Sequence, residues 1–224
     1  GSGKTTLLRA LTGELHFGGS VTLEGLALRS LTPLALAERR AVLPQAVPMA
    51  FPFTVLEVVR LGLIGRAALG RGAPDLPRRA LAEVGLAGYE ARLFQQLSGG
   101  EQQRAHLARV LVQVWRPVVD GQARWLFLDE PVAALDIGHQ LQIMRLAKDF
   151  ARAGGGVIAV MHDLNLTAMT ADRVTLMHAG GVLAEGPPAQ VFTNATLSRA
   201  YGCTLRVSTT PPDGGVFVLP QAAA

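Results

Sequence analysis

The chain opens with Gly1-Ser2-Gly3-Lys4-Thr5-Thr6, and an apolar stretch follows at once, Leu7-Leu8-Arg9-Ala10-Leu11. The apolar residues recur at helical spacing, so we expect a helix to follow the glycines. Glycines let backbone N–H groups approach phosphate oxygens, and the positive end of a helix dipole attracts the same anions. The stretch therefore predicts the second half of a phosphate-binding loop, although small polar residues before a helix also serve as ordinary caps.

The complete phosphate-loop pattern, G-x-x-x-x-G-K-[ST], places its first glycine five residues before Gly3. That position precedes residue 1, and so does the strand that normally feeds the loop. We therefore expect a fold that is truncated at its N-terminus. Within the remaining loop, Lys4 can reach the β- and γ-phosphates of a nucleotide, and the Thr5 hydroxyl can bind Mg²⁺.

Composition limits the classes of protein that this sequence can encode. Hydrophobic residues make up 49% of the 224 residues and charged residues 17%, so the chain can bury a sizeable core and is not disordered. One cysteine, Cys203, excludes a disulfide framework and an all-cysteine metal site. Since no apolar run approaches the roughly 18 residues of a membrane span, a membrane role would require a partner.

The formal net charge of +4 does not by itself indicate a nucleic-acid partner. Of 21 basic residues only Lys4 and Lys148 are lysine, which leaves 19 arginines, and the adjacent basic pairs are Arg39-Arg40 and Arg78-Arg79. A solvated, arginine-rich surface explains this pattern better than a nucleic-acid patch does. We therefore predict no nucleic-acid partner.

Short apolar runs alternate with helical patterns through most of the chain. We expect strands at 21–23, 41–43, 125–128 and 157–161, a hairpin of strands at 174–177 and 182–184, and helices at 35–40 and 188–201. From residue 46 to about residue 114 no strand signal is convincing, and periodic apolar residues with a Gly/Pro/Arg connector at 65–78 predict a helical lobe. The fold class is therefore α/β, with a parallel sheet and an inserted helical lobe.

The apolar run at 125–128 ends in two adjacent carboxylates, Asp129 and Glu130. The first carboxylate beyond a buried strand can hold Mg²⁺, directly or through water, and the second can orient or deprotonate an attacking water. Taken alone, the pair would more simply be an acidic turn at a strand end. Together with Lys4 and Thr5, it predicts a nucleotide-hydrolysing site.

The stretch Leu97-Ser98-Gly99-Gly100-Glu101-Gln102-Gln103 is the most specific in the chain. Ser98 and Glu101 have the spacing of a capping box, in which each side chain bonds the backbone of the other at a helix start. A capping box does not require two adjacent glycines, which weaken a first helical turn. Glycines and a serine at a helix N-terminus make a second anion site. Two phosphate sites and one nucleotide per chain suggest that one site serves a neighbouring chain.

The order of these motifs resembles that of the nucleotide-binding subunits of ATP-binding-cassette transporters. The resemblance covers the whole chain and rests on the half phosphate loop, Gln45 after a strand, LSGGEQQ at 97–103, LFLDEP at 126–131, Leu135-Asp136 and His162. It implies a P-loop NTPase (RecA-like) fold in one domain over residues 1–224. The core would be 1–45 and 116–224, with a helical subdomain at about 46–115.

The resemblance also implies roles for individual residues and the cofactors ATP and Mg²⁺. Gln45 would be the lid glutamine, Glu130 the general base and His162 the switch histidine at the γ-phosphate. Asp136 would lie at the seam of a dimer. The remaining residues would bind nucleotide (Gly1, Ser2, Gly3, Lys4, Thr5, Thr6), bind Mg²⁺ (Thr5, Asp129, Gln45) or form the signature that contacts the partner's nucleotide (Ser98, Gly99, Gly100, Glu101).

Finer similarity points to the haemin-import ATPases, a branch grouped with iron-siderophore and cobalamin importers. The segments that carry it are 40–45, 51–55, 112–115, 138–140, the tail at 201–202 and 218–220, and the long segment 113–124. This similarity implies an ATPase that energises haem uptake across the inner membrane. A siderophore-iron or cobalamin importer is the alternative, and an exporter subunit or a non-transport cassette ATPase acting on ribosomes or DNA is less favoured.

The same resemblance implies the partners and the location. The subunit would form a homodimer on two transmembrane permease subunits, at the cytoplasmic face of a bacterial inner membrane. A periplasmic haem-binding protein would act with it indirectly. The transported cargo would not touch this subunit.

Two features depart from the family pattern. Val132 and Ala133 stand where the family usually has threonine and then serine or another small residue. The lost hydroxyls put hydrogen bonds of the loop before Asp136 in doubt. The aromatic residue that normally stacks on adenine would precede residue 1, so ATP as the nucleotide follows from the resemblance.

Overall fold

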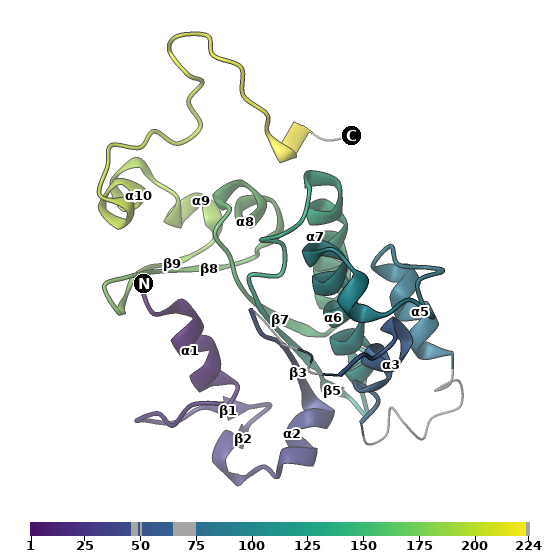
Figure 1. The fold of residues 1–224 in the computed structure, drawn as a ribbon. Helices are drawn as coiled ribbons and strands as arrows, with labels where there is room; N and C mark the ends of the chain where they lie inside the picture. Colours follow the sequence, from purple (N-terminus) through teal and green to yellow (C-terminus); the bar gives the residue numbers. More distant parts are fainter. Residues whose placement is uncertain (46–48, 50, 65–74, 223–224) are drawn as a thin grey trace. The chain divides into compact units, whose positions relative to one another are not determined.

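The computed structural model describes residues 1–45, 49, 51–64 and 75–222, and they form two compact units. One unit is residues 8–160, and the other joins residues 1–7 to residues 161–224 (Figure 1). Most of the connector expected at 65–78 lies outside the described residues, as does part of the expected helical subdomain. Among the described residues, no helix has the length and apolar character needed to cross a membrane.

A parallel sheet forms the centre of the unit of residues 8–160. Its strands are β3 (Arg40–Leu43), β6 (Trp125–Asp129) and β7 (Gly156–Val160), in the order β3-β6-β7. Both pairings are parallel and in continuous register, with β6 in the middle. The predicted parallel sheet is therefore confirmed, with strand ends within one residue of those expected.

The two faces of this sheet pack against different helices. Leu8, from the second half of α1 (Lys4–Leu11), packs with Phe127 and Val160 on one face. Leu126 and Leu128 are fully buried and point to the other face, because successive side chains of a strand alternate. Helices α6 (Gly99–Gln113) and α7 (Ile137–Arg152) contact β3 and β7 there (Figure 1). The central strand β6 is thus buried on both sides, as its apolar sequence requires.

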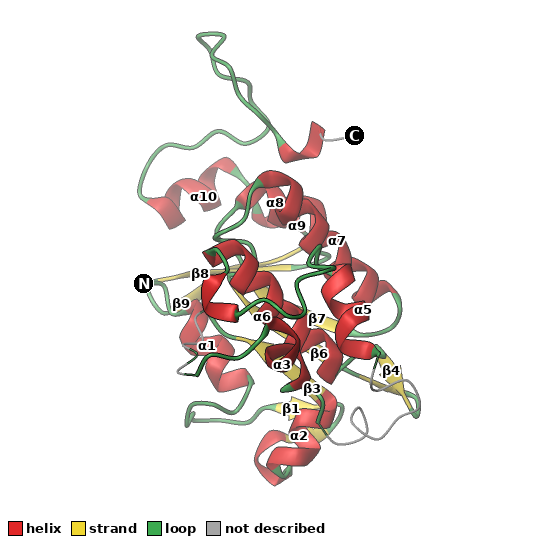
Figure 2. Cartoon of the chain, turned by 45° about the vertical axis from the view of Figure 1, so that its right-hand side comes forward, coloured by secondary structure: helices red, strands yellow, loops and turns green. Residues whose placement is uncertain are grey.

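The helices expected between residues 46 and 114 are present in the described part of that range. They are α3 (Val55–Arg60), α5 (Leu76–Glu83), the 3₁₀ turn η2 (Phe94–Gln96) and α6, and Figure 2 shows α3, α5 and α6 packed together. Residues 51–64 and 75–114 contain no strand, as expected, and their β-type hydrogen bonding is limited to one isolated bridge between Thr54 and Leu93. Gln113, at the end of α6, donates to the carbonyls of Ala37 (2.8 Å) and Arg40 (2.9 Å), at the end of α2 (Pro33–Arg39).

Two short antiparallel hairpins add strands that the sequence analysis did not predict. β1 (Thr22–Leu23) was expected, but its partner β2 (Leu26–Ala27) and the pair β4 (Val118–Val119) and β5 (Gln122–Ala123) were not. Asp120 and Gly121 have φ values of +52° and +74°, the left-handed backbone of a tight two-residue hairpin turn. An Asp-Gly pair is a recognised hairpin signal, so this element was accessible from sequence.

The other unit contains the predicted hairpin, β8 (Val174–His178) with β9 (Gly181–Gly186). Around it lie α8 (Leu164–Thr170), α9 (Pro188–Val191), α10 (Asn194–Tyr201) and the 3₁₀ turn η3 (Pro220–Ala222). The single helix expected at 188–201 is wrong, because Thr193 is extended (φ −108°, ψ 159°) and its side chain accepts from the Thr196 N–H. Thr193 thereby begins a new helix in place of continuing the first.

Gly62, just after α3, lies too close to α6 to carry a side chain. A Cβ at this position would collide with the carbonyl of Arg109 and lie 2.6 Å from Cγ2 of Val112. We expect Gly62→Ala to lower the free energy of unfolding by about 1–3 kcal/mol, because the backbone must shift to relieve the overlap. Urea denaturation measures the change. Gly18→Ala is the control, since no atom of the described residues lies within 4 Å of a Cβ there; equal losses in both variants would contradict the close approach.

Candidate functional site

The carboxyl ends of β3 and β6 bring Gln45 and Glu130 together. These strands are adjacent and parallel, so the residues that follow them meet at one edge of the sheet, where ligands of α/β folds bind. The Nε2 of Gln45 donates to Oε2 of Glu130 at 3.2 Å. An amide and a carboxylate in contact at this edge can together orient a water molecule, because the carboxylate accepts a proton and the amide offers both a donor and an acceptor.

Glu130 has an unusual backbone conformation. Its φ is +52°, in the left-handed region, which costs a non-glycine residue on the order of 1–3 kcal/mol. Its N–H donates to the carbonyl of Val160 on β7 at 3.1 Å. Its own carbonyl accepts from Nε2 of Gln103 at 2.8 Å and from the Ala133 N–H at 3.3 Å. Gln103 was not among the predicted site residues, and its place in the 97–103 stretch was the one signal that pointed to it.

Asp129 is the last residue of β6 and is only 3% exposed. A carboxylate, the Thr5 hydroxyl and the Gln45 amide oxygen are the hard oxygen donors that Mg²⁺ prefers, so the predicted set suits this ion chemically. The described residues contain no cluster of three or more His, Cys, Asp or Glu side chains able to hold a metal. Phosphate and water would have to complete the coordination, which is usual for Mg²⁺.

The predicted phosphate loop belongs to the other unit. Gly3 has φ of +88°, which favours glycine, and α1 begins at the next residue with no acidic side chain in its first turn. Leu7 N–H donates to the Gly3 carbonyl at 2.9 Å as the first turn closes. Lys4 Nζ donates to Oγ of Ser2 at 3.3 Å, so its ammonium lies over the loop. A helix start without carboxylates and with a lysine at its first residue suits a phosphate.

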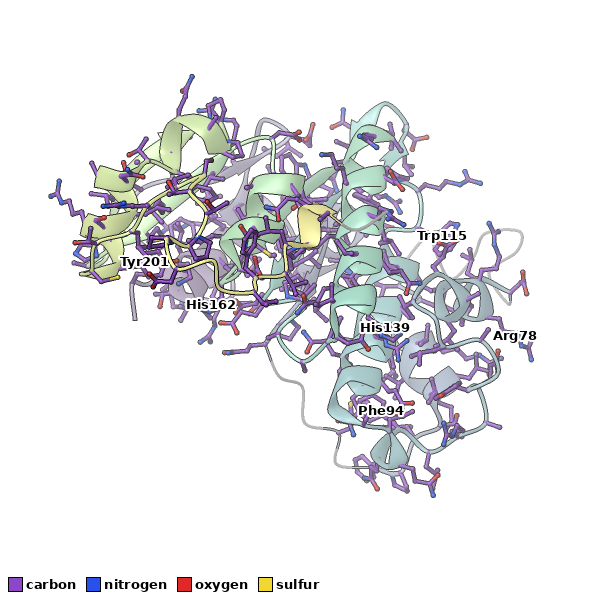
Figure 3. The ribbon with its side chains drawn as sticks, turned by 90° about the horizontal axis from the view of Figure 1, so that it is seen from above. Arg78, Phe94, Trp115, His139, His162 and Tyr201 are labelled. Carbon is purple, nitrogen blue, oxygen red and sulfur yellow. The ribbon has the colours of Figure 1, made fainter. Side chains whose placement is uncertain are left out.

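His162 is the second residue after β7 and also belongs to this unit (Figure 3). It directly precedes Asp163, whose carboxylate caps α8 by accepting the Leu166 N–H at 2.9 Å. Gln45, Asp129, Glu130 and the 97–103 stretch lie in the unit of residues 8–160.

Ser98 and Glu101 form the capping box that their spacing allowed. Ser98 Oγ accepts from the Glu101 N–H at 3.3 Å, and Oε2 of Glu101 accepts from the Ser98 N–H at 2.7 Å. That backbone bond lowers the pKa of the Glu101 carboxyl below its usual value. A hydroxyl that accepts one bond still has its own proton to donate, so Ser98 can cap α6 and bind a phosphate at once.

The two glycines of the 97–103 stretch lie in different surroundings. A Cβ at Gly100 would be 2.9 Å from the carbonyl oxygen of Ala134 and 3.2 Å from Cδ2 of Leu135. Packing within the chain therefore explains why residue 100 is a glycine. At Gly99, no atom of the described residues lies within 4 Å of a Cβ. Nothing in the described chain requires a glycine there, which leaves room at the start of α6 for a ligand or another chain.

Asp136 begins α7 and is largely exposed. Its carboxylate accepts from the His139 N–H at 2.9 Å and contacts the His139 ring at 2.8 Å, and these bonds lower its pKa below the usual value. No residue of the loop before it, 131–135, carries a hydroxyl. Gln140 Nε2 instead donates to the carbonyls of Val132 (3.3 Å) and Leu135 (3.0 Å), and the Val132 side chain is buried. The loop is therefore held through its backbone.

Comparisons with known proteins point to one family. The family model described as "ABC transporter" matches residues 1–133. The "Hemin import ATP-binding protein HmuV" of Jannaschia sp. (strain CCS1) is 63% identical over all of this chain and 82% of its own length. The protein of the same name from Roseobacter denitrificans is 58% identical over all of this chain and 85% of its own length.

Solved structures show the same fold at lower identity. An ATP-binding cassette of an ABC transporter in its ADP conformation has a TM-score of 0.71 at 21% identity, covering 89% of this chain and 83% of that one. CbiO1 from Clostridium perfringens, part of an ABC transporter complex, has a TM-score of 0.67 at 23% identity, covering 88% of this chain and 78% of that one. At these identities the likeness establishes the fold, which is the α/β fold expected from the sequence.

The contrast between Gly99 and Gly100 gives a test in terms of stability. We expect Gly100→Ala to lower the free energy of unfolding by about 1–3 kcal/mol through its overlap with the Ala134 carbonyl. Gly99→Ala should leave it unchanged or raise it by up to about 1 kcal/mol, because alanine is the better helix former. Urea denaturation of the two variants and the parent measures both effects, and equal stability of the two variants would refute the packing role of Gly100.

Proposed function

Because the chain belongs to the ABC transporter family, we propose that it is the ATP-hydrolysing subunit of an importer that carries haem. Identity of 63% over the whole chain to a relative named for hemin import is the observation that carries the choice of cargo. We further propose that the subunit acts as a homodimer with two membrane permease subunits, at the cytoplasmic face of a bacterial inner membrane. A haem-binding protein on the opposite side would deliver the cargo.

In this proposal the residues of the phosphate loop and of the sheet edge divide the work. Backbone N–H groups of residues 1–6 and the Lys4 ammonium hold the phosphates of ATP. Thr5, Asp129 and Gln45 would hold Mg²⁺, which would neutralise charge on the phosphates. Glu130 accepts a proton from the attacking water, and Gln45 orients the Glu130 carboxylate through the 3.2 Å bond. His162 contacts the γ-phosphate.

The signature residues would complete the partner's ATP site. Ser98 retains a hydroxyl proton to donate, and the start of α6 offers backbone N–H groups to an anion. The open surroundings of Gly99 among the described residues support contact with a second chain there. Each ATP then lies between Lys4 of one subunit and Ser98 of the other, with Glu101 holding Ser98 in place and Asp136 near the seam.

The role of Glu130 is tested by Glu130→Gln, measured in the ATPase assembled with its permease. Loss of a general base should lower kcat by about 10²–10⁴ while ATP still binds, because the amide keeps the shape of the carboxylate. Single-turnover hydrolysis and equilibrium ATP binding separate the two effects. Glu83→Gln, at an exposed position on α5, is the matched control and should keep the parent rate. A parent-like rate for Glu130→Gln would assign the base elsewhere.

The cargo can be tested with the same variant in cells. A strain whose only copy carries Glu130→Gln should fail to grow on haemin as sole iron source, yet grow on ferric siderophores and need no added cobalamin. Failure on siderophore iron with normal use of haemin would favour the siderophore importer. Haem-dependent growth at the parent rate would contradict the proposed cargo.

The shared site is tested by mixing two inactive variants, Lys4→Ala and Ser98→Arg, both in the Glu130→Gln background. In a mixed dimer one site inherits both lesions, whereas the other combines an intact loop with an intact signature. We expect each homodimer to trap no nucleotide and the mixed dimer to trap one. Trapped nucleotide is measured in place of ATP turnover, because hydrolysis that needs both sites would hide the rescue. Two affinity tags report whether mixed dimers form, and mixed dimers without trapped nucleotide would refute the shared site.

A further inference from the structure

Glu130 is held in its left-handed conformation from three directions. Its N–H is bonded to Val160 on β7, its carboxylate to Gln45 beyond β3, and its carbonyl to Gln103 on α6. The Gln103 bond is 2.8 Å, the shortest of the three. The carbonyl also accepts the Ala133 N–H, at 3.3 Å. Gln103 is thus the side chain that fixes the peptide between Glu130 and Pro131.

That peptide needs an external partner because its conformation is unfavourable. A φ of +52° is disfavoured for glutamate, and a residue before proline favours extended backbone. Such a conformation persists only where its surroundings determine it. Because the direction of the Cα–Cβ bond depends on φ, a Glu130 that relaxed toward extended backbone would point its carboxylate away from Gln45.

The neighbours of Gln103 on α6 serve other purposes. Gln102 donates to the carbonyls of Phe94 (3.3 Å) and Leu97 (3.1 Å), before the helix begins. Arg104 donates to the carbonyls of Val84 (3.0 Å) and Gly85 (3.1 Å), at the end of α5. Of these three consecutive side chains, Gln103 is the one bonded to the end of β6. Its contact is therefore distinct from the bonds that fasten α6 to the other helices.

We propose that Gln103 is a positioning residue for ATP hydrolysis, which it supports by holding the Glu130 peptide so that the carboxylate faces the attacking water. The proposal rests on the proposed function, since it requires Glu130 to be the general base. In this role Gln103 acts through the Glu130 carbonyl that it bonds, with no contact of its own to ATP required. Its loss should therefore slow the chemical step and leave ATP binding almost unchanged.

The first test is Gln103→Met, which keeps the length of the side chain and removes the donor, in the ATPase assembled with its permease. We expect kcat to fall about 10- to 100-fold, because small misplacements of a reacting group have effects of this size. The dissociation constant for ATP should change by less than about threefold. A parent-like kcat, or a loss of affinity as large as the loss of rate, would overturn the proposal.

Gln113→Met is the matched control. It removes the same kind of bond, from an amide on the same helix to the carbonyls of Ala37 and Arg40, far along α6 from Glu130. It should lower the midpoint of thermal unfolding at least as much as Gln103→Met does, yet keep kcat within about threefold. An equal loss of kcat in both variants would show that Gln103 acts through general stability of α6.

The decisive test combines Gln103→Met with Glu130→Gln. If Gln103 acts through the Glu130 carboxylate, its loss should slow single-turnover hydrolysis by no more than about twofold once the carboxylate is absent. The same 10- to 100-fold loss in both backgrounds would overturn the proposal. A parent-like rate for Glu130→Gln alone would instead refute the proposed function, so the two failures can be told apart.

Conservative variants cover the case in which Gln103→Met does not fold. Gln103→Lys keeps a donor and should retain most of kcat, whereas Gln103→Glu has the shape of glutamine but cannot donate and should lose as much as Gln103→Met. Equal rates for the lysine and glutamate variants would overturn the proposal.

Discussion

The parallel pairing of β6 with β3 on one side and β7 on the other is the constraint on which the rest of the unit of residues 8–160 depends. The strand is buried on both faces, so its apolar residues fix where it ends and which polar residue comes first beyond the core. Asp129 is still buried at that end, and Glu130 is partly exposed. Because β3 runs parallel beside it, Gln45 reaches the same edge from a point 85 residues earlier in the chain.

In the proposed function, helix α6 contributes to two different sites. Its first turn carries the capping box and Gly99, and the open surroundings of Gly99 in the described chain suit an anion from a partner. One turn later Gln103 contacts the Glu130 peptide. Gly100 packs on the carbonyl of Ala134, in the loop between β6 and α7. A shift of the first turn of α6 would therefore displace Glu130 of the same chain. The contacts of Gly100 and Gln103 lie within five residues of each other on this one helix.

The main elements of the fold were predictable from the sequence because each rests on a local pattern. The strand at 125–128, the capping box at Ser98 and the hairpin around Gly180 were all expected, and the Asp120-Gly121 turn could have been. The break at Thr193 was missed because apolar periodicity continues through it. The φ of Glu130 could not be predicted, since a left-handed glutamate before proline contradicts its local preference and exists only because distant residues bond to it.

Glutamine amides hold much of the irregular backbone in the unit of residues 8–160. Five of them donate Nε2 to main-chain carbonyls, at the ends of elements where helices and strands leave acceptors without partners; they are Gln102, Gln103, Gln113, Gln140 and Gln142. A neutral amide loses less hydration free energy on partial burial than an ammonium or guanidinium does. Such an amide bond keeps the shape of the loop before Asp136, where Val132 and Ala133 stand in place of hydroxyl residues. Gln140 bonds the backbone on either side of Ala133, and the apolar Val132 side chain adds to the buried core.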